Sequence, residues 1–374
     1  MRKPYLLVIA ALVLAAGLPA SGVRADAQET AGIFRLSLIT ETMALPFALP
    51  NIPNMPNIPG MAGLFKPRRS VSSDAVYPNQ AVPPIWVSVP ADLHLPDNKL
   101  VLNVPPPITT GGPTGGGGGQ TGGNQQPVKM EFVTKLYWHP DTAQGPLGSD
   151  VTIDTSKLPR APRGAPQMPP AAGWEKMMEE RARTASGSAP ITLDAATGQG
   201  SYTLNTGNLT MPLAGFLPAL HVTAPAALNS VNLPDGILVT WDPVPGARGF
   251  ILHAMSMTKE GDKTTLIRWV STLQQPPERV QNSDDYQQDT TISDDLAANI
   301  LLPAGTASCL VPPGIFPATP DFFTLDVVAV GADYYDKINQ GATANSITIY
   351  GKIRSKWKGM KMGKMMGMPQ GGAQ

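Results

Sequence analysis

The chain has 374 residues, and its 28 basic and 28 acidic side chains leave no net charge when histidine is neutral. Without a basic excess, the sequence has no electrostatic footprint for nucleic acid, so we expect none among its partners. Only 15% of the residues are charged, whereas 40 are proline and 37 are glycine. This composition is unlike that of a compact cytosolic enzyme and predicts folded β modules joined by irregular segments.

Residues 1–25 have the pattern of a secretory signal peptide. Two basic residues precede an almost unbroken apolar run from Leu6 to Leu18, and Val23-Arg24-Ala25 supplies a small-x-small cleavage site. The run is shorter than the roughly 20 apolar residues that a transmembrane helix needs. We therefore predict cleavage near Ala25 and a mature chain that is periplasmic or secreted. The alternative is an uncleaved membrane anchor.

Residues 26–70 are predicted to be a Pro-rich disordered linker. Between Ala48 and Gly60 a proline recurs at every third position. Proline fixes φ near −65° and removes a backbone donor, so we expect an extended polyproline II spacer without a core. The alternative is a docking peptide for a groove on a partner.

Residues 71–218 are predicted to form a β-rich region with a Gly-rich insertion at residues 111–127. The insertion contains five consecutive glycines and should be a flexible coil. Because loop-closure entropy grows slowly with length, we place the strands on either side of it in one sheet. The insertion lacks the Gly-Lys-Ser/Thr sequence of a phosphate-binding loop. The expected elements are strands at 84–89, 99–104 and 131–138, a short helix at 173–183 and a hairpin at 201–211.

Residues 219–353 are predicted to form a β-sandwich. Ile237, Val239 and Trp241 alternate with Leu238 and Thr240, which is the period of a strand with one face in a core, and a Pro/Gly turn follows. The same two-residue period resumes at Phe250. We also expect strands at 266–270, 321–330 and 346–350 and a short helix at 293–300. The prediction depends on a shared interior filled by five side chains: Ile237, Trp241, Phe250, Leu325 and Ile347.

This order of strand, tryptophan, Pro-x-Pro-Gly turn and aromatic-led strand resembles the B and C strands of a fibronectin type III domain. Residues 323–329 and 346–350 resemble its F and G strands. Phe250 and Phe323 stand where that family usually has tyrosine, and the region is longer than such a domain. The resemblance implies a type III-like, immunoglobulin-like sandwich with insertions.

The whole chain also resembles a family of uncharacterised exported proteins of Gram-negative bacteria. The matching segments are residues 131–138, 254–255 and 308–316, together with a Lys-, Ser- and Met-rich end. This resemblance implies that the protein is exported, and it implies no particular activity.

No residue pattern in the chain points to catalysis. The four histidines, His94, His139, His221 and His253, lack metal-ligand spacings, and no catalytic serine or zinc motif occurs. We expect His253 to face solvent and the single cysteine, Cys309, to be a buried, inert thiol. The acidic run from Asp284 to Asp295 lacks the spacing of a calcium loop, so a solvated loop and a helix N-terminus explain it better than a metal.

Residues 354–374 are expected to form a basic, Met-rich tail. Thioether sulfurs are soft ligands that select Cu(I), and Met-x-Met and Met-x-x-Met spacings let one chain bring several of them to one ion. The candidate ligands are Met360, Met362, Met365, Met366 and Met368.

An alternative is contact of this tail with an anionic surface, at which the tryptophan and the methionines would insert. A third interpretation is an ordered end that packs on the acidic body of the protein. The residues of the surface contact would be Lys356, Trp357, Lys358, Lys361 and Lys364.

The sequence thus predicts a mostly β, exported, non-enzymatic cell-envelope protein that acts as a binding or interaction module through its sandwich loops or tail. Its partner would be an unknown protein or envelope component, and we expect no cofactor. The alternative functions are periplasmic copper handling through the tail and a hydrolase with a loop-built site.

Overall fold

The computed structural model describes residues 32–44, 66–77, 81, 84–105, 129–154, 183–192, 196–281, 290–339 and 346–363. The predicted signal peptide, the Gly-rich insertion and the predicted helix at 173–183, apart from Arg183, lie outside these residues. The described chain is mostly β, as the composition and periodicity predicted.

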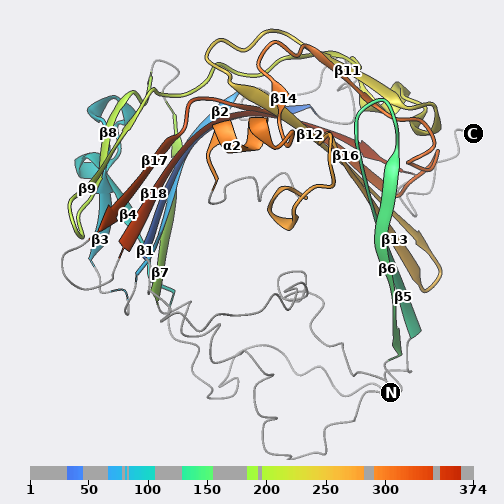
Figure 1. Cartoon of the computed structure of the whole chain (residues 1–374), viewed down its shortest axis with the longest axis horizontal. Coiled ribbons are helices and arrows are strands. Elements are labelled where there is room, and N and C mark those ends of the chain that lie inside the picture. The colour runs from blue at the N-terminus through green and yellow to red at the C-terminus, as the bar shows by residue number, and fades with distance from the viewer. Residues whose placement is uncertain are drawn as a thin grey trace, which may run out of the picture.

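An 11-stranded sheet forms the centre of the molecule and curves into an arch (Figure 1). Its main path is β6-β5-β13-β12-β16-β18-β1-β2-β7, with β14 paired to β12 and β17 paired to β18. The pairs β1–β18 and β5–β13 are parallel, and the other pairs are antiparallel. The strands are β1 (Gly32–Ala44), β2 (Arg68–Val76), β5 (Lys129–Trp138), β6 (Gln144–Asp154), β7 (Thr184–Ile191), β12 (Gly249–Glu260), β13 (Lys263–Val270), β14 (Leu302–Pro303), β16 (Phe322–Val330), β17 (Tyr334–Asn339) and β18 (Ser346–Met362).

Two smaller sheets lie on the convex side of the arch (Figure 1). The three-stranded layer has the order β10-β11-β15, and the four-stranded layer has the order β4-β3-β8-β9. Their bounds are β10 (Val222–Ala224), β11 (Ile237–Trp241), β15 (Ser308–Val311), β4 (Lys99–Leu102), β3 (Ile85–Ser88), β8 (Gly200–Leu204) and β9 (Leu209–Leu213). Short helices lie in the connections between strands. They are 3₁₀ turns at Ala91–Leu93, Pro96–Asn98, Leu228–Ser230, Leu233–Asp235 and Glu278–Val280, and α2 at Ile292–Ala297.

One continuous hydrophobic core joins both layers to the large sheet. In the three-stranded layer, Trp241 packs on Phe250 of β12 with ring centroids 5.2 Å apart. Four of the five predicted interior side chains are fully buried, and Ile347 is half-buried against the same cluster, so the predicted interior is confirmed. In the four-stranded layer, β9 comes so close to β18 that a Cβ on Gly351 would lie 2.5 Å from the sulfur of Met211. This contact explains the glycine at the centre of β18.

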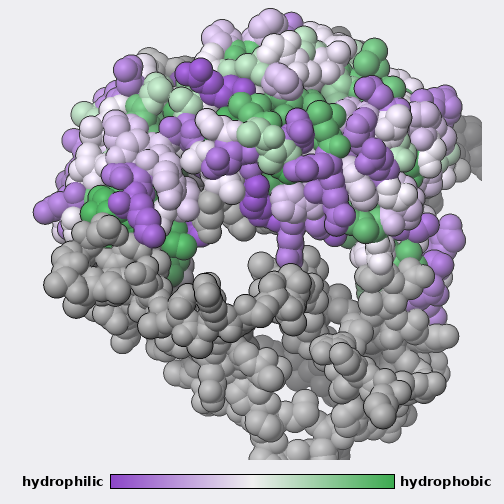
Figure 2. All heavy atoms as spheres, viewed as in Figure 1, coloured by the Kyte–Doolittle hydropathy of each residue, from purple (hydrophilic) through white to green (hydrophobic). Residues whose placement is uncertain are grey.

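The concave side of the large sheet is partly covered by α2 and its flanking loops (Figure 1). A second, smaller apolar cluster lies here, and it contains Ile251, Val328 and Val330 from the sheet and Ile292 from α2. In the same view, hydrophobic residues gather near the centre and hydrophilic ones border them (Figure 2). Beyond this cluster, the concave face carries polar side chains such as Lys352, Arg354 and Lys356, and methionines of β12 and β18.

The range 26–70, predicted to be a linker, contains all of β1 and the start of β2. Phe34, Leu36 and Leu38 alternate with half-buried or polar residues and fill the core. That alternation is the period of a strand, and the prolines that follow obscured it.

The boundary predicted between residues 353 and 354 falls inside β18, which continues to Met362. Ile353, Ser355 and Trp357 point into the core, whereas Lys352, Arg354 and Lys356 occupy the concave face. Because one face of the strand is basic, the segment has the composition of a solvated tail although it is paired along both edges.

The strands on either side of the Gly-rich insertion lie in different sheets, contrary to our expectation. β3 and β4 belong to the four-stranded layer, whereas β5 pairs with β13 in the large sheet. A long connection costs little entropy wherever its ends lie, so its presence could not assign the strands to one sheet.

Candidate functional site

The two outer layers meet along a seam that is bridged by the connection between β9 and β10. Two hydroxyls beneath this connection hold it against the large sheet: Thr40 of β1 donates to the Leu217 carbonyl at 2.8 Å, and Ser355 of β18 accepts from the Leu220 amide at 2.9 Å. Thr40 and Ser355 are register partners on neighbouring strands and are both buried. We call these two contacts the seam clamp.

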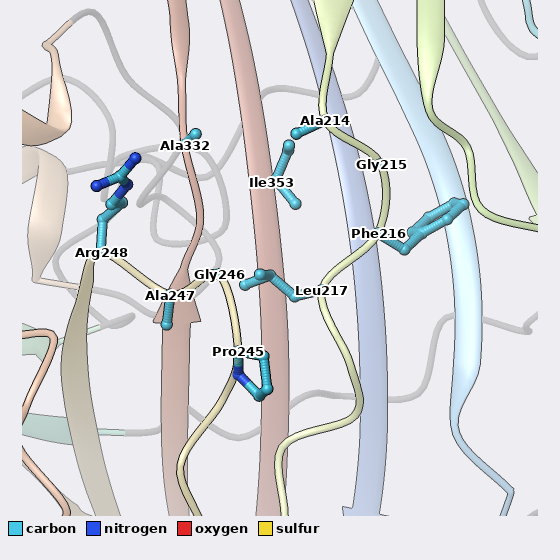
Figure 3. Close-up of a pocket in the computed structure, with 10 residues that line it drawn as sticks. All are labelled: Ala214, Gly215, Phe216, Leu217, Pro245, Gly246, Ala247, Arg248, Ala332 and Ile353. Atoms are coloured by element: carbon cyan, nitrogen blue, oxygen red, sulfur yellow. The ribbon is translucent and has the colours of Figure 1, made fainter.

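A pocket of about 510 Å³ opens at this seam (Figure 3). Its lining comes from the β9–β10 connection, the turn between β11 and β12, the connection between β16 and β17, and β18. This volume falls in the range of small-molecule sites. The lining residues are Ala214, Gly215, Phe216, Leu217, Pro245, Gly246, Ala247, Arg248, Ala332 and Ile353.

The turn that forms one wall of the pocket depends on Gly246. This glycine has a φ of 86°, a conformation that L side chains rarely adopt, and a Cβ there would lie 3.3 Å from Leu217. The turn is tied to the large sheet because the Arg248 amide donates to the Val330 carbonyl at 2.7 Å. The wall is therefore held in place by the backbone.

Arg248 is the one charged residue among those that line the pocket. It lies at one margin with its guanidinium directed away from Leu217, while Phe216 lies at the opposite margin (Figure 3). The Arg69 guanidinium lies over the Phe216 ring, 5.5 Å from the ring centroid. The pocket can thus hold an apolar group with a cation at its mouth, but its lining offers no acid, base or nucleophile.

The predicted tail residues are placed on β18 or lie outside the described chain. Met360 and Met362 lie on β18, with Met362 exposed, whereas Met365, Met366 and Met368 lie outside the described residues. The structure therefore brings two of the five candidate copper ligands onto a strand and says nothing of the other three.

The residues of the predicted surface contact are not arranged as a free tail. Lys356 and Trp357 are buried, and the Lys361 ammonium donates to the Val231 carbonyl at 2.6 Å. Lys358 is half-buried, and Lys364 lies outside the described residues. Pairing within the sheet withdraws Lys356 and Trp357 from any external surface, so the third interpretation, an ordered end, fits the described part of this segment.

Buried charges gather on the concave face where α2 meets the sheet. The Lys352 ammonium lies 3.5 Å from Asp333, and Arg279 pairs with the buried Asp295 at 2.6 Å. Burial lowers the pKa of Lys352, and the carboxylates of Asp333 and Asp295 oppose that shift. Asp295, expected near the N-terminus of a short helix, lies in the first turn of α2, where it is buried and ion-paired.

Two of the histidines make polar contacts that the structure defines. His253 is buried, contrary to our expectation, and its Nε2 lies 2.8 Å from the Val280 carbonyl because the loop before α2 covers this part of β12. His221 pairs with Asp242 at 2.7 Å on an exposed face. In the described part of the chain, no serine, threonine or cysteine side chain hydrogen-bonds to His221.

Cys309 is buried in β15, as predicted, and burial together with the nearby Asp141 raises the pKa of its thiol to about 12. Within the described ranges, no three His, Cys, Asp or Glu side chains are grouped so that they could hold a metal. No helix in those ranges has the length and apolar character needed to cross a membrane.

Comparison of the chain with known proteins gave no matching family, no similar curated protein and no similar solved structure.

Sequence reasoning missed both the seam pocket and its clamp. The pocket lining joins residues between 214 and 353 that are mostly glycine, alanine and proline, and these residue types carry no chemical signature. The one available signal was the Pro-Gly turn at residues 245–246, which marked a tight bend without indicating what packs against it.

Proposed function

We propose that this protein is an exported, non-enzymatic binding module whose C-terminal half is a fibronectin type III-like sandwich. The support for the fold is strand order: β11 and β12 follow each other in sequence but lie in opposing sheets, and β12, β16 and β18 are neighbours. These relations match the B, C, F and G strands of an immunoglobulin-like sandwich, with β10 and β15 beside B. The unusual addition is that β1 and β5 extend the sheet at both edges.

Export is supported by where the folded strands begin. The predicted cleavage after Ala25 precedes Gly32, the first residue of β1, so removal of the signal peptide leaves every described strand intact. Expression of the full chain in a Gram-negative host and mass spectrometry of the periplasmic fraction would test this. The expected mass begins at Asp26, and an intact chain confined to the cytoplasm would contradict export.

The binding role depends on one observation, the preformed seam pocket. Its apolar floor of Leu217, Ala332 and Ile353 is matched by a single cation, Arg248, at the mouth. Such a site favours a small apolar group that carries one negative charge, because the apolar part leaves water while the anion remains near the guanidinium. We therefore assign the pocket to a ligand or partner terminus that ends in a carboxylate beside an apolar chain.

Octanoate and decanoate are suitable probes, and displacement of the anionic dye anilinonaphthalene sulfonate provides a readout. We expect saturable binding that Ala214→Trp abolishes by filling the pocket and that Arg248→Gln weakens about 5–10-fold, as for loss of one charge-assisted contact. The matched controls are Ala226→Trp and Lys259→Gln, which change exposed residues outside the lining. Equal binding by Ala214→Trp and the wild type would refute the pocket.

A further inference from the structure

Four methionines lie on the concave face around the start of β16. In the register of the large sheet, Thr324 stands between Met255 of β12 and Met360 of β18. One step along the strands, Phe322 stands between Met257 and Met362. Register partners in neighbouring strands share a face, so all four side chains project from the same side of the sheet. We call this group the methionine frame.

The spacing of the frame suits convergence of the four sulfurs. Neighbouring strands are about 4.8 Å apart and same-face residues along a strand about 6.7 Å apart, so the Cα atoms span roughly 10 by 7 Å. The arch is concave on this side (Figure 1), which tilts side chains from flanking strands toward one another. Thr324, at the centre of one row, is buried and is shorter than the methionines that flank it.

The frame is also open to solvent. Met257 is 39% exposed and Met362 is 46% exposed, and Met255 and Met360 are half-buried. An ion could therefore reach the sulfurs without unfolding of the sheet. Unbranched thioether side chains have three rotatable bonds, which lets them rearrange around an incoming ion.

We propose that the methionine frame binds Cu(I). Thioethers are soft, neutral ligands, and soft ligands select Cu(I) over the divalent ions that prefer nitrogen or oxygen. Met-x-Met on β18 places Met360 and Met362 on one face, and Met255 and Met257 supply the second half of the site from β12. The copper is bound as Cu(I), and no electron transfer is involved.

Charged side chains of both signs lie near the frame. Arg268 of β13 is the register partner of Met255 on the side away from Thr324. Lys358 of β18 lies two residues before Met360 and is the register partner of Asp326 of β16. Asp326 also lies 3.5 Å from the Lys356 ammonium. A monovalent ion adds a single charge to this mixed environment, so electrostatic repulsion is smaller than a divalent ion would meet.

The frame is independent of the seam pocket. The pocket uses Ile353, which projects to the convex side of β18, whereas Met360 projects to the concave side because the two are an odd number of residues apart. Failure of copper binding therefore leaves the carboxylate-binding function untouched, and the converse also holds.

Competition for Cu(I) against bicinchoninate under anaerobic conditions tests the proposal. We compare the wild type, Met255→Leu/Met360→Leu, Met257→Leu/Met362→Leu, and a chain truncated after Gly363. Leucine keeps the apolar volume, so folding should be preserved. We expect each double variant to lose at least 10-fold in affinity and the truncated chain to keep wild-type affinity. The control is Met211→Leu, which changes a methionine buried in the core.

Silver(I) with methyl-labelled methionine gives a second readout by NMR. Methyl signals of the four frame residues should shift together, and that of Met211 should not. Absence of Cu(I) binding by the full chain would overturn the proposal. So would binding that disappears on truncation after Gly363 but survives in both double variants, because the ligands would then lie in the terminal segment.

Discussion

The two outer layers share one sheet and one core, but they are assembled from the chain in different ways. Every strand of the three-stranded layer lies between residues 222 and 311, close in sequence to the strands it covers. The four-stranded layer joins β3 and β4 to β8 and β9 across residues 103–199. One layer therefore forms from nearby segments, while the other requires a long loop to close first. The question is whether two layers that assemble from the chain in these different ways unfold together as one cooperative unit.

The largest expected effect comes from removing one large side chain from each layer. Trp241→Ala and Tyr202→Ala each delete a buried aromatic ring, and the second also removes the hydroxyl that donates to the Gly198 carbonyl at 2.7 Å. We expect each to lower the free energy of unfolding by about 3–5 kcal/mol. Because one core joins the layers, urea unfolding followed by tryptophan fluorescence and far-UV circular dichroism should show one shifted transition in both variants.

Exposed residues provide the matched controls. Leu238 of the three-stranded layer is 58% exposed and Val101 of the four-stranded layer is 59% exposed. Leu238→Ala and Val101→Ala should each change the free energy of unfolding by less than about 0.5 kcal/mol. If Tyr202→Ala split the curve into two transitions and moved only one of them, the layers would be separate folding units.

The seam clamp should give the next largest effect, because it holds the connection between the two layers against the large sheet. Thr40→Val leaves the buried Leu217 carbonyl without its donor, and Ser355→Ala leaves the Leu220 amide without its acceptor. Each change should cost about 1–3 kcal/mol. Both contacts hold the same connection, so the double variant should cost less than the sum of the two, by about 0.5 kcal/mol or more. Strict additivity in chemical denaturation would show that the connection is held independently at its two ends.

The same contrast explains how far sequence reasoning could go. Strands β11 and β12 were predicted because Ile237, Trp241 and Phe250 lie in runs with a strand period and a Pro/Gly turn between them, whereas β10 was not predicted. The hairpin β8–β9 was predicted for the same local reason. Register across long separations carries no such signal, so the parallel pairing of β1 with β18 could not be derived. The pocket and the methionine frame both depend on that long-range register.

The buried Lys352 provides a smaller effect that is confined to alkaline pH. Its pKa is lowered by burial, so the unfolded chain binds this proton more tightly than the native protein does. Stability should therefore rise as pH increases from the lowered pKa toward the ordinary lysine value near 10.5. Lys352→Met should remove this rise, whereas Lys259→Met, at an exposed position, should retain it. Parallel pH profiles for the wild type and Lys352→Met, from denaturant titrations, would exclude a destabilised ammonium.

The smallest expected effect concerns local opening of the outer layers, which thiol labelling measures in the folded protein. Cys309 is 5% exposed in β15, and the pKa of its thiol is raised to about 12, so almost no reactive thiolate is present at pH 8. A disulfide reagent can react only when the three-stranded layer opens. The Met211→Cys variant, combined with Cys309→Ser, reports in the same way on the four-stranded layer.

A shared core predicts that the two thiols are labelled at similar, slow rates, since exposing either one requires the same opening of the large sheet. Labelling of Cys309 that is more than 100-fold faster than labelling at position 211 would mean that the locally assembled layer detaches while the other stays closed. The packing of the three-stranded layer supports similar, slow labelling of the two thiols. β11 is packed through Trp241 on β12, and β12 is paired along both edges in the centre of the sheet. Detaching that layer would uncover Trp241, whose removal the first prediction expects to cost about 3–5 kcal/mol.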